Sequence, residues 1–219
     1  AVPTVSRALK DAPDIGETTK ATVRRIAEEI GYVPNRAGVR LRTGRTMVIS
    51  LVLSTDHDVL DDHTNRMISS VAQSLRGTGY HTIVTPYASS EDLLDPIRYI
   101  VETRSADAII TSQTEPDDRR IAYMMERGFP FATYGRTRWS REHPWFDFDN
   151  LTFGEIAANA LLDKGRRHLM LIAPPLEQSY SQHIISGIRK AMEGRDARFE
   201  IIEGITSHDT NAEVRVALA

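Results

Sequence analysis

Apolar β-branched runs alternate with amphipathic segments from residue 47 onward. The runs are typical of buried parallel strands and fall at Met47–Leu53, His81–Thr85, Ala106–Thr111, Phe129–Tyr134, His168–Ala173 and Arg198–Ile202. Segments with helical periodicity separate most of them, including 64–76 and 151–164. In the latter, one face is formed by Ile156, Ala157, Ala160 and Leu161. This alternation predicts an α/β fold with doubly wound parallel sheets and right-handed crossovers.

The alternation breaks between Tyr134 and Leu151, where the stretch GRTRWSREHPWFDFDN reads as a crossover into a second lobe. About two predicted strands follow this crossover, too few to close a sheet around a core. We therefore expect a first lobe, a partial second lobe, and a sequence that is a fragment of a longer protein.

Two short helices are predicted before residue 34. TVSRALKD (Thr4–Asp11) places Val5 and Leu9 on one face and Arg7 away from it. The second helix follows Gly16, a tolerable N-cap, and ends at Gly31 before Pro34. Its predicted buried stripe consists of Val23, Ile26, Ala27 and Ile30.

Charge is distributed unevenly along the chain. The formal net charge of the 219 residues is -3, but residues 1–46 carry nine basic and five acidic side chains, a net charge of +4. The remainder carries 18 basic and 25 acidic side chains. A basic segment on an acidic body is typical of a nucleic-acid binder, and a solvated charged face is the alternative.

Several classes of protein are disfavoured by what the sequence lacks. Without Cys there is no disulfide framework, thiolate nucleophile or thiolate metal site. The sequence holds no bilayer-spanning apolar run and no signal peptide, which predicts a cytoplasmic protein without membrane contact. The acidic stretch DHDVLDDHTN matches no standard zinc spacing. No nucleophile elbow, P-loop or G-x-G-x-x-G motif is present, so we predict no catalytic residues, cofactor or metal.

The segments TVSRAL and IGYVPNRAGVRLRTGRT, in this order and spacing, resemble the headpiece of LacI-type bacterial transcription regulators. The resemblance extends less specifically over the whole chain and implies a two-lobed, periplasmic-binding-protein-like core. It predicts a partial helix-turn-helix headpiece at 1–34, a hinge helix at 35–46, an N-terminal lobe at 47–148 and a partial C-terminal lobe at 149–219. It also suggests that the sequence is truncated at both ends.

The resemblance implies which residues meet DNA. A recognition helix lies in the major groove with its N-terminal side chains on base edges. Val2, Pro3 and Thr4 occupy the positions that read bases in the family, and Ser6 and Arg7 can reach phosphate or a guanine edge.

The hinge segment NRAGVRL, with Asn35 and Arg36 at its start, matches the family's minor-groove helix. Leu41 occupies the position of the leucine that the family wedges between base steps. Seven residues are too few for a stable helix in water, and Gly38 weakens it by about 1 kcal/mol relative to alanine. We therefore expect a hinge that folds only on DNA, next to the hinge of a second protomer.

Effector-binding residues are expected in loops at the carboxyl ends of the strands. The candidates are Asp56, His57, Arg136, Asp149, Tyr180, Gln182 and His183. Two of them have a structural alternative: Arg136 as an interlobe ion pair, and Asp149, more readily, as the N-cap of 151–164.

Two positions depart from the pattern of sugar-responsive family members. Gly135 stands where many carry an aspartate, and Ile184 stands where they carry an arginine. Both departures disfavour an ordinary hexose effector.

The resemblance, together with the basic N-terminal segment, implies a homodimeric repressor that binds a palindromic double-stranded DNA operator. Its effector is predicted to be a small molecule, a sugar or related metabolite. The alternatives are a solute-binding receptor of the same two-lobed fold that does not bind DNA, and an enzyme that processes sugars or nucleosides on an α/β scaffold.

Overall fold

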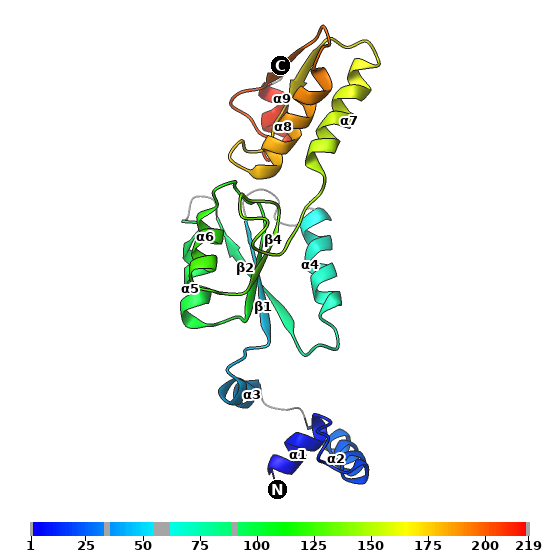
Figure 1. Cartoon of the computed structure of the whole chain (residues 1–219), viewed down its shortest axis with the longest axis vertical. Coiled ribbons are helices and arrows are strands. Elements are labelled where there is room, and N and C mark those ends of the chain that lie inside the picture. Colours follow the sequence, from blue (N-terminus) through cyan, green and yellow to red (C-terminus); the bar gives the residue numbers. More distant parts are fainter. Residues whose placement is uncertain (1, 33–35, 55–61, 89–91, 218–219) are drawn as a thin grey trace. The chain divides into compact units, whose positions relative to one another are not determined.

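A computed structural model describes residues 2–32, 36–54, 62–88 and 92–217 of the chain (Figure 1). The chain divides into two compact units, Ala1–Arg45 and Thr46–Ala219, and each is described separately. The predicted boundaries at residues 34 and 148 stay predictions.

The first unit contains α1 (Val2–Leu9), α2 (Glu17–Glu29) and α3 (Arg36–Thr43). Helix α1 packs against α2 and buries Ala8 completely. As predicted, Gly16 is the N-cap of α2 and Gly31 follows its end with a positive φ of 62°. The buried stripe was wrong in part, because Ile26 and Ile30 are 42% and 69% exposed. An eight-residue α1 offers too little apolar surface to cover all of α2.

The second unit begins with a five-stranded parallel sheet of order β2-β1-β3-β4-β5. Its strands are β1 (Val48–Ser54), β2 (His81–Tyr87), β3 (Ala108–Thr111), β4 (Phe131–Tyr134) and β5 (Trp145–Phe146). The first four match predicted runs. Strand β5 was not predicted, because two exposed aromatic residues at a sheet edge show no alternation that marks a strand.

Three helices cover this sheet: α4 (Asp62–Ser74) on one face, α5 (Asp95–Thr103) and α6 (Arg119–Glu126) on the other (Figure 1). The core of the first lobe is apolar and includes Val52, Ile97, Ile109, Ile121 and Met124, each fully buried. Parallel strands covered on both faces confirm the predicted α/β fold.

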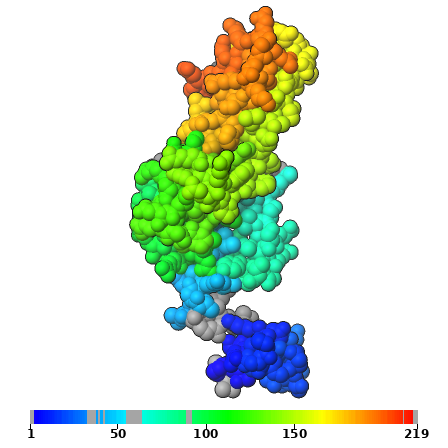
Figure 2. All heavy atoms as spheres, viewed as in Figure 1, coloured from blue at the N-terminus to red at the C-terminus, as the bar shows by residue number. Residues whose placement is uncertain are grey.

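The second lobe has two parallel strands, β6 (His168–Leu171) and β7 (Arg198–Ile201). Its helices are α7 (Asn150–Leu162), α8 (Ser179–Met192) and α9 (Asn211–Ala217). In Figure 2 the atoms of this lobe, yellow to red, form one continuous body. Within the described part of the chain, no helix is long and apolar enough to cross a membrane.

Helix α7 buries a different face from the one that its sequence suggests. Ile156 and Leu161, on the predicted apolar face, are 63% and 44% exposed. The buried residues are instead Gly154, Ala158 and Leu162, spaced four apart. The small residues Gly154 and Ala158 let α8 approach closely, so the fit between the two helices, and not the hydrophobicity of the side chains, decided which face was buried.

Asp107 fixes the start of β1. Its carboxylate accepts hydrogen bonds from the Thr46 backbone N–H (2.7 Å), the Thr46 hydroxyl (2.8 Å) and the Met47 N–H (3.0 Å). Met47 adopts a left-handed φ of 57°, which a non-glycine residue rarely takes. Burial raises the pKa of Asp107, but these bonds and one from Tyr80 lower it by more, so the net shift is downward.

Asp107→Asn is therefore expected to destabilise the second unit by about 1–3 kcal/mol at neutral pH. Because the folded-state pKa is lowered, the stabilisation is present above the unfolded pKa of about 3.9 and is lost as the pH falls through the folded value. Urea unfolding of both proteins from pH 7 to pH 3 tests this. The difference should shrink on acidification, whereas Asp163→Asn, at an exposed ion pair, should give little difference at any pH.

Candidate DNA-binding headpiece and effector cleft

Helix α1 presents polar and apolar side chains to solvent at the predicted base-reading positions. Pro3, Thr4 and Arg7 are exposed, and Ser6 is half-buried. Arg7 forms an ion pair with Asp14, so binding a phosphate would exchange one anionic partner for another. The side chain of Val2 lies outside the described part of the structure.

Acidic neighbours already neutralise part of the basic charge of the first unit. Lys20 is buried between Asp11 and Glu17, with nitrogen–oxygen distances of 3.1 and 2.7 Å. Arg24 also contacts Asp11 (2.9 Å), and these neighbours lower the Asp11 pKa. Of the nine basic residues counted in the sequence, Lys20 therefore serves the packing of the unit and not a DNA surface.

Helix α3 confirms the predicted hinge helix and carries a highly exposed leucine. Leu41 is 89% exposed, the highest exposure of the large apolar side chains described. Gly44 follows the helix with φ +70°, and its N–H bonds to the Arg40 carbonyl (2.8 Å). Asn35 and the side chain of Arg36 lie outside the described part. Folding of this segment only on DNA stays a prediction.

A cavity of about 280 Å³ lies where the two lobes of the second unit meet. It lies beyond the carboxyl ends of β3 and β4, as expected for a ligand site in an α/β fold. Both lobes contribute to its lining: Thr64, Met67, Ser112, Gln113, Thr114, Tyr134, Gly135, Asp147, Phe148, Asn150, Tyr180 and His208. We call this cavity the cleft.

The structure divides the predicted effector-binding residues among different places. Tyr180 lines the cleft, whereas Arg136, Gln182 and His183 line a separate cavity of about 230 Å³. Asp149 is the N-cap of α7 and accepts bonds from the Thr152 N–H (3.0 Å) and hydroxyl (2.8 Å), as its structural alternative predicted. Asp56 and His57 lie outside the described residues, as does most of the stretch considered for a metal.

Arg136 forms an ion pair within the first lobe, and not the interlobe pair that was its alternative. Its Nε lies 3.1 Å from Asp147 Oδ2, and its terminal nitrogen donates to the Phe148 carbonyl (3.3 Å). The guanidinium also lies over the Trp145 ring, 5.2 Å from the centroid. Because the Asp147 side chain is only 5% exposed, Arg136 supplies the charge that lets a buried carboxylate face the cleft.

Two phenols in the cleft remain neutral at physiological pH. Burial, with a smaller effect of Asp147, raises the pKa of Tyr134 to about 12. Burial, with a smaller effect of Glu177, likewise raises that of Tyr180 to about 12. The Tyr180 hydroxyl lies 2.8 Å from His208 Nε2. His208 was not identified from the sequence as a site residue, because it stands in a loop far along the chain and belongs to no motif. The cleft thus offers hydroxyl groups and one buried carboxylate to a polar ligand.

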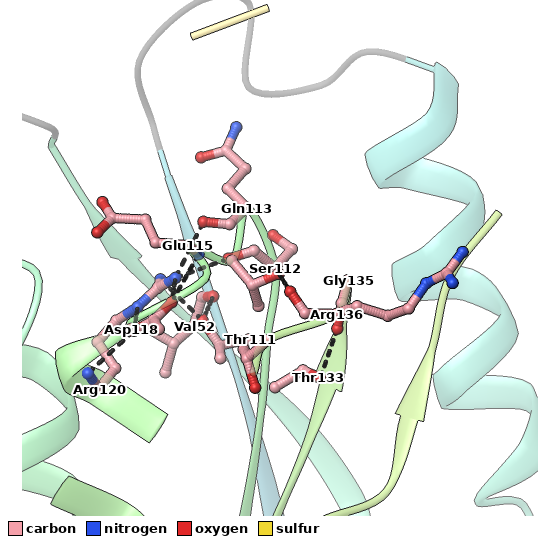
Figure 3. Close-up of polar contacts among 12 residues, drawn as sticks. Val52, Thr111, Ser112, Gln113, Glu115, Asp118, Arg120, Thr133, Gly135 and Arg136 are labelled. Carbon is pink, nitrogen blue, oxygen red and sulfur yellow. Dashed lines mark hydrogen bonds and ion pairs between the residues drawn. The ribbon is translucent and has the colours of Figure 1, made fainter. Parts of the chain in front are cut away.

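A buried arginine organises the loop that lines the cleft after β3 (Figure 3). Arg120 is 2% exposed and forms a two-pronged ion pair with Asp118, at 3.0 and 2.7 Å. It also donates to the Ser112 carbonyl (3.1 Å) and the Gln113 carbonyl (3.0 Å). Gln113 adopts a left-handed φ of 51°, and the hydrogen bonds from Arg120 hold its backbone in this unfavourable conformation. Arg120 thereby positions the loop whose side chains reach the cleft.

The backbone geometry at position 135 explains why glycine replaces the aspartate of the family pattern there. The φ of Gly135 is +122°, and a Cβ there would lie well under 3.0 Å from the Thr114 hydroxyl oxygen. That hydroxyl donates to the Arg136 carbonyl (2.9 Å). A side chain at position 135 is therefore incompatible with this loop. At the second departure, Ile184 is buried in the core of the second lobe and does not line the cleft.

Comparisons with known proteins place the chain among bacterial regulators. Residues 1–35 match a family model described as "Bacterial regulatory proteins, lacI family". The chain is 33% identical over 181 residues to the HTH-type transcriptional regulator RafR of Escherichia coli, covering 82% of this chain and 53% of that protein. It is 30% identical over 191 residues to the HTH-type transcriptional regulator AglR of Rhizobium meliloti, covering 86% and 53%. The chain thus spans about half the length of these curated relatives.

Solved structures share the fold. The lac repressor dimer bound to operator and an anti-inducer matches with a TM-score of 0.72 and 16% identity, covering 92% of this chain and 61% of that one. The complex of the regulator CelR with cellobiose matches with a TM-score of 0.59 and 22% identity, covering 92% and 62%. These likenesses confirm the two-lobed α/β core that follows a headpiece and hinge. Because the family model and the curated relatives together cover both units, the chain belongs to the LacI family of bacterial regulatory proteins.

Proposed function

We propose that this chain acts as a ligand-responsive transcription regulator, a repressor that binds a palindromic operator as a homodimer. The proposal rests foremost on the match of residues 1–35 to the LacI family model, which falls on the helix pair where Pro3, Thr4 and Arg7 are exposed. Thr4 and Arg7 have the donors that base edges and phosphates accept. The Pro3 ring suits apolar contact, for instance with a thymine methyl group.

The hinge would add a minor-groove contact. Leu41 is 89% exposed on a short helix, and an exposed leucine in an arginine-rich helix suits insertion between base steps while arginines meet phosphates. Asn35 and Arg36 would take part at the start of the hinge. Because an eight-residue helix is marginal in water, its folding would be coupled to DNA binding.

Leu41→Ala is expected to weaken specific operator binding by at least about tenfold, which corresponds to about 1.4 kcal/mol. Nonspecific binding should change little, because it depends on phosphate contacts. Fluorescence anisotropy with operator and scrambled duplexes measures both affinities. The control Arg40→Gln removes a cation instead, so it should weaken both to a similar extent and lower the salt dependence. Equal losses on both duplexes for Leu41→Ala would rule out the wedge.

The effector would be a sugar or related metabolite bound in the cleft. Tyr134, Tyr180 and the buried Asp147 offer hydroxyl and carboxylate partners, and Phe148 offers an apolar wall. Sugars present hydroxyl groups and apolar ring faces that suit such a lining. The CelR structure contains cellobiose, which is consistent with a saccharide as ligand class. Asp56 and His57 remain candidates for this site.

Regulation would follow from linkage. An effector that binds one arrangement of the two lobes better than another shifts their equilibrium, and the hinges of a dimer would then meet DNA at a different spacing. A coupling free energy of about 1–3 kcal/mol is typical of such systems and would change operator affinity about 5- to 150-fold.

The deciding experiment selects binders from random duplex DNA with the full-length protein and then titrates the selected duplex against salt. A palindrome with a flexible pyrimidine–purine step at its centre, bound with a steep salt dependence, is the expected result. Absence of any enriched sequence, with and without candidate sugars, would contradict the proposal and favour a solute-binding receptor. The curated relatives are transcriptional regulators, so the comparisons do not favour that alternative.

A further inference from the structure

Helix α8 begins in a setting that favours an anion. It has 14 residues, and its N-cap residue, Gln178, makes no side-chain capping bond. The partial positive charge at a helix N-terminus and the N–H groups of the first turn attract anions. The Ser179 N–H donates to the Thr114 carbonyl (2.8 Å), which holds this end of the helix against the first lobe.

An unpaired hydroxyl is buried at the same place. Ser179 is only 4% exposed, and its Oγ has no hydrogen-bond partner among the residues described. One turn along the helix, His183 Nδ1 is buried and likewise lacks a partner in that part of the chain. Buried polar atoms are nearly always hydrogen-bonded, so two of them beside one cavity point to a missing ligand.

Both residues line the cavity of about 230 Å³ that the cleft does not include. Its remaining lining residues are Pro116, Arg136, Thr137, Arg138 and Gln182. Among the residues that the structure describes, the lining therefore contains two arginines and no carboxylate. The loop that carries the arginines is held in place, since the Arg138 N–H donates to the Pro116 carbonyl (3.0 Å).

The two arginines differ in how readily they could bind a ligand. Arg136 pairs with the buried Asp147, which balances most of its charge, so it is the less available of the two. Arg138 pairs with Asp117 at the surface, where the two side chains are 61% and 69% exposed. A surface pair of this kind is weak, so Arg138 can exchange its partner for another anion.

His183 fits the same chemistry as a neutral group. Burial and then Arg136 lower its pKa, while Asp147 and Asp149 oppose the shift. A neutral imidazole near neutral pH can donate one N–H without adding charge.

We propose that this cavity binds a small oxyanion, the phosphate group of free phosphate or of a small phosphorylated metabolite. The ligands would be the Ser179 hydroxyl, the first turn of α8, the Arg138 guanidinium and the His183 imidazole. The site is separate from the cleft and does not depend on the proposed saccharide effector. Because Ser179 and Thr114 join the two lobes there, an anion would act at the contact between the lobes.

Isothermal titration of the full chain with inorganic phosphate, against a chloride control of equal ionic strength, tests the site. We expect binding that Ser179→Ala and Arg138→Gln each weaken by about tenfold. The control Arg141→Gln removes an exposed arginine that does not line the cavity and should bind phosphate like wild type. In NMR spectra, phosphate should shift the amide signals of residues 179–181.

Titration with glycerol 3-phosphate distinguishes the two sources. Tighter binding than inorganic phosphate identifies a phosphorylated metabolite, and equal or weaker binding identifies free phosphate. Both results support the site. Ser179→Ala removes an unpaired buried hydroxyl and should leave the fold intact, so its result is interpretable. Phosphate binding that neither variant weakens, or no heat beyond the chloride control, would overturn the proposal.

Discussion

Arg120→Met is expected to destabilise the second unit by about 3–5 kcal/mol, because it leaves the carboxylate of Asp118 buried without its cation. Asp118 and Arg120 are each 2% exposed. Besides the ion pair, Arg120 donates to the Tyr87 hydroxyl (3.2 Å) and the Thr111 hydroxyl (3.1 Å), so the substitution also leaves these groups with fewer partners. Methionine keeps most of the side-chain volume, which limits any cavity.

Unfolding in guanidinium chloride measures this loss of stability as a lower midpoint concentration of denaturant, with little change in the m-value. Arg119→Met is the matched control. Arg119 precedes Arg120 in the same helix, but its side chain is 74% exposed and only approaches Asp92 at 3.9 Å. It should change stability by less than about 0.5 kcal/mol. The double variant Asp118→Asn/Arg120→Met should recover part of the loss, because it removes the unpaired charge. Equal stability of Arg120→Met and Arg119→Met would contradict the buried network.

Arg120→Met should also weaken ligand binding in the cleft. Arg120 holds the carbonyl groups of Ser112 and Gln113, and both residues line the cleft. Once these bonds are lost, the left-handed backbone conformation of Gln113 is no longer stabilised, and the loop can relax. Effector affinity should therefore fall in protein that is still folded, as measured by titration well below the unfolding temperature.

Gly187→Ala is expected to destabilise the second lobe by about 3 kcal/mol or more, although alanine normally stabilises a helix relative to glycine by about 1 kcal/mol. A Cβ at position 187 would lie well under 3.0 Å from the Leu151 carbonyl oxygen and 2.9 Å from the Glu155 nitrogen. Both are backbone atoms of α7 and cannot rotate away as a side chain would. The two helices must therefore move apart, which loses packing between them, and overpacking costs about 1–3 kcal/mol in addition.

Gly38→Ala is the control with the opposite sign. Gly38 is also helical, but no atom of the described part of the chain lies within 4 Å of the added Cβ. It should therefore raise the helicity of a peptide spanning residues 30–46 and strengthen operator binding. Thermal unfolding followed by circular dichroism measures the effect of Gly187→Ala on the chain. If Gly187→Ala also raised stability, the close contact of α7 and α8 would be wrong.

The sequence by itself determined the features that depend on local chemistry. Alternating β-branched runs and amphipathic segments predicted four strands of the first sheet and both strands of the second, since periodicity records which positions are buried. Gly16, Gly31 and Asp149 marked helix ends correctly, because capping depends on only a few neighbouring residues. The spacing of the headpiece and hinge motifs identified the family.

Only the tertiary structure decided what depends on residues far apart in the chain. Whether Arg136 faced a ligand or an ion pair depended on Asp147, and the burial of Arg120 depended on hydroxyl groups from two strands. Tyr180 lines the cleft and His183 lines the second cavity, although only three positions separate them on one helix, because residues 112–114 of the first lobe line the cleft and residues 136–138 line the second cavity. The buried face of α7 followed from two glycines that let backbones meet, which a hydrophobic pattern does not record.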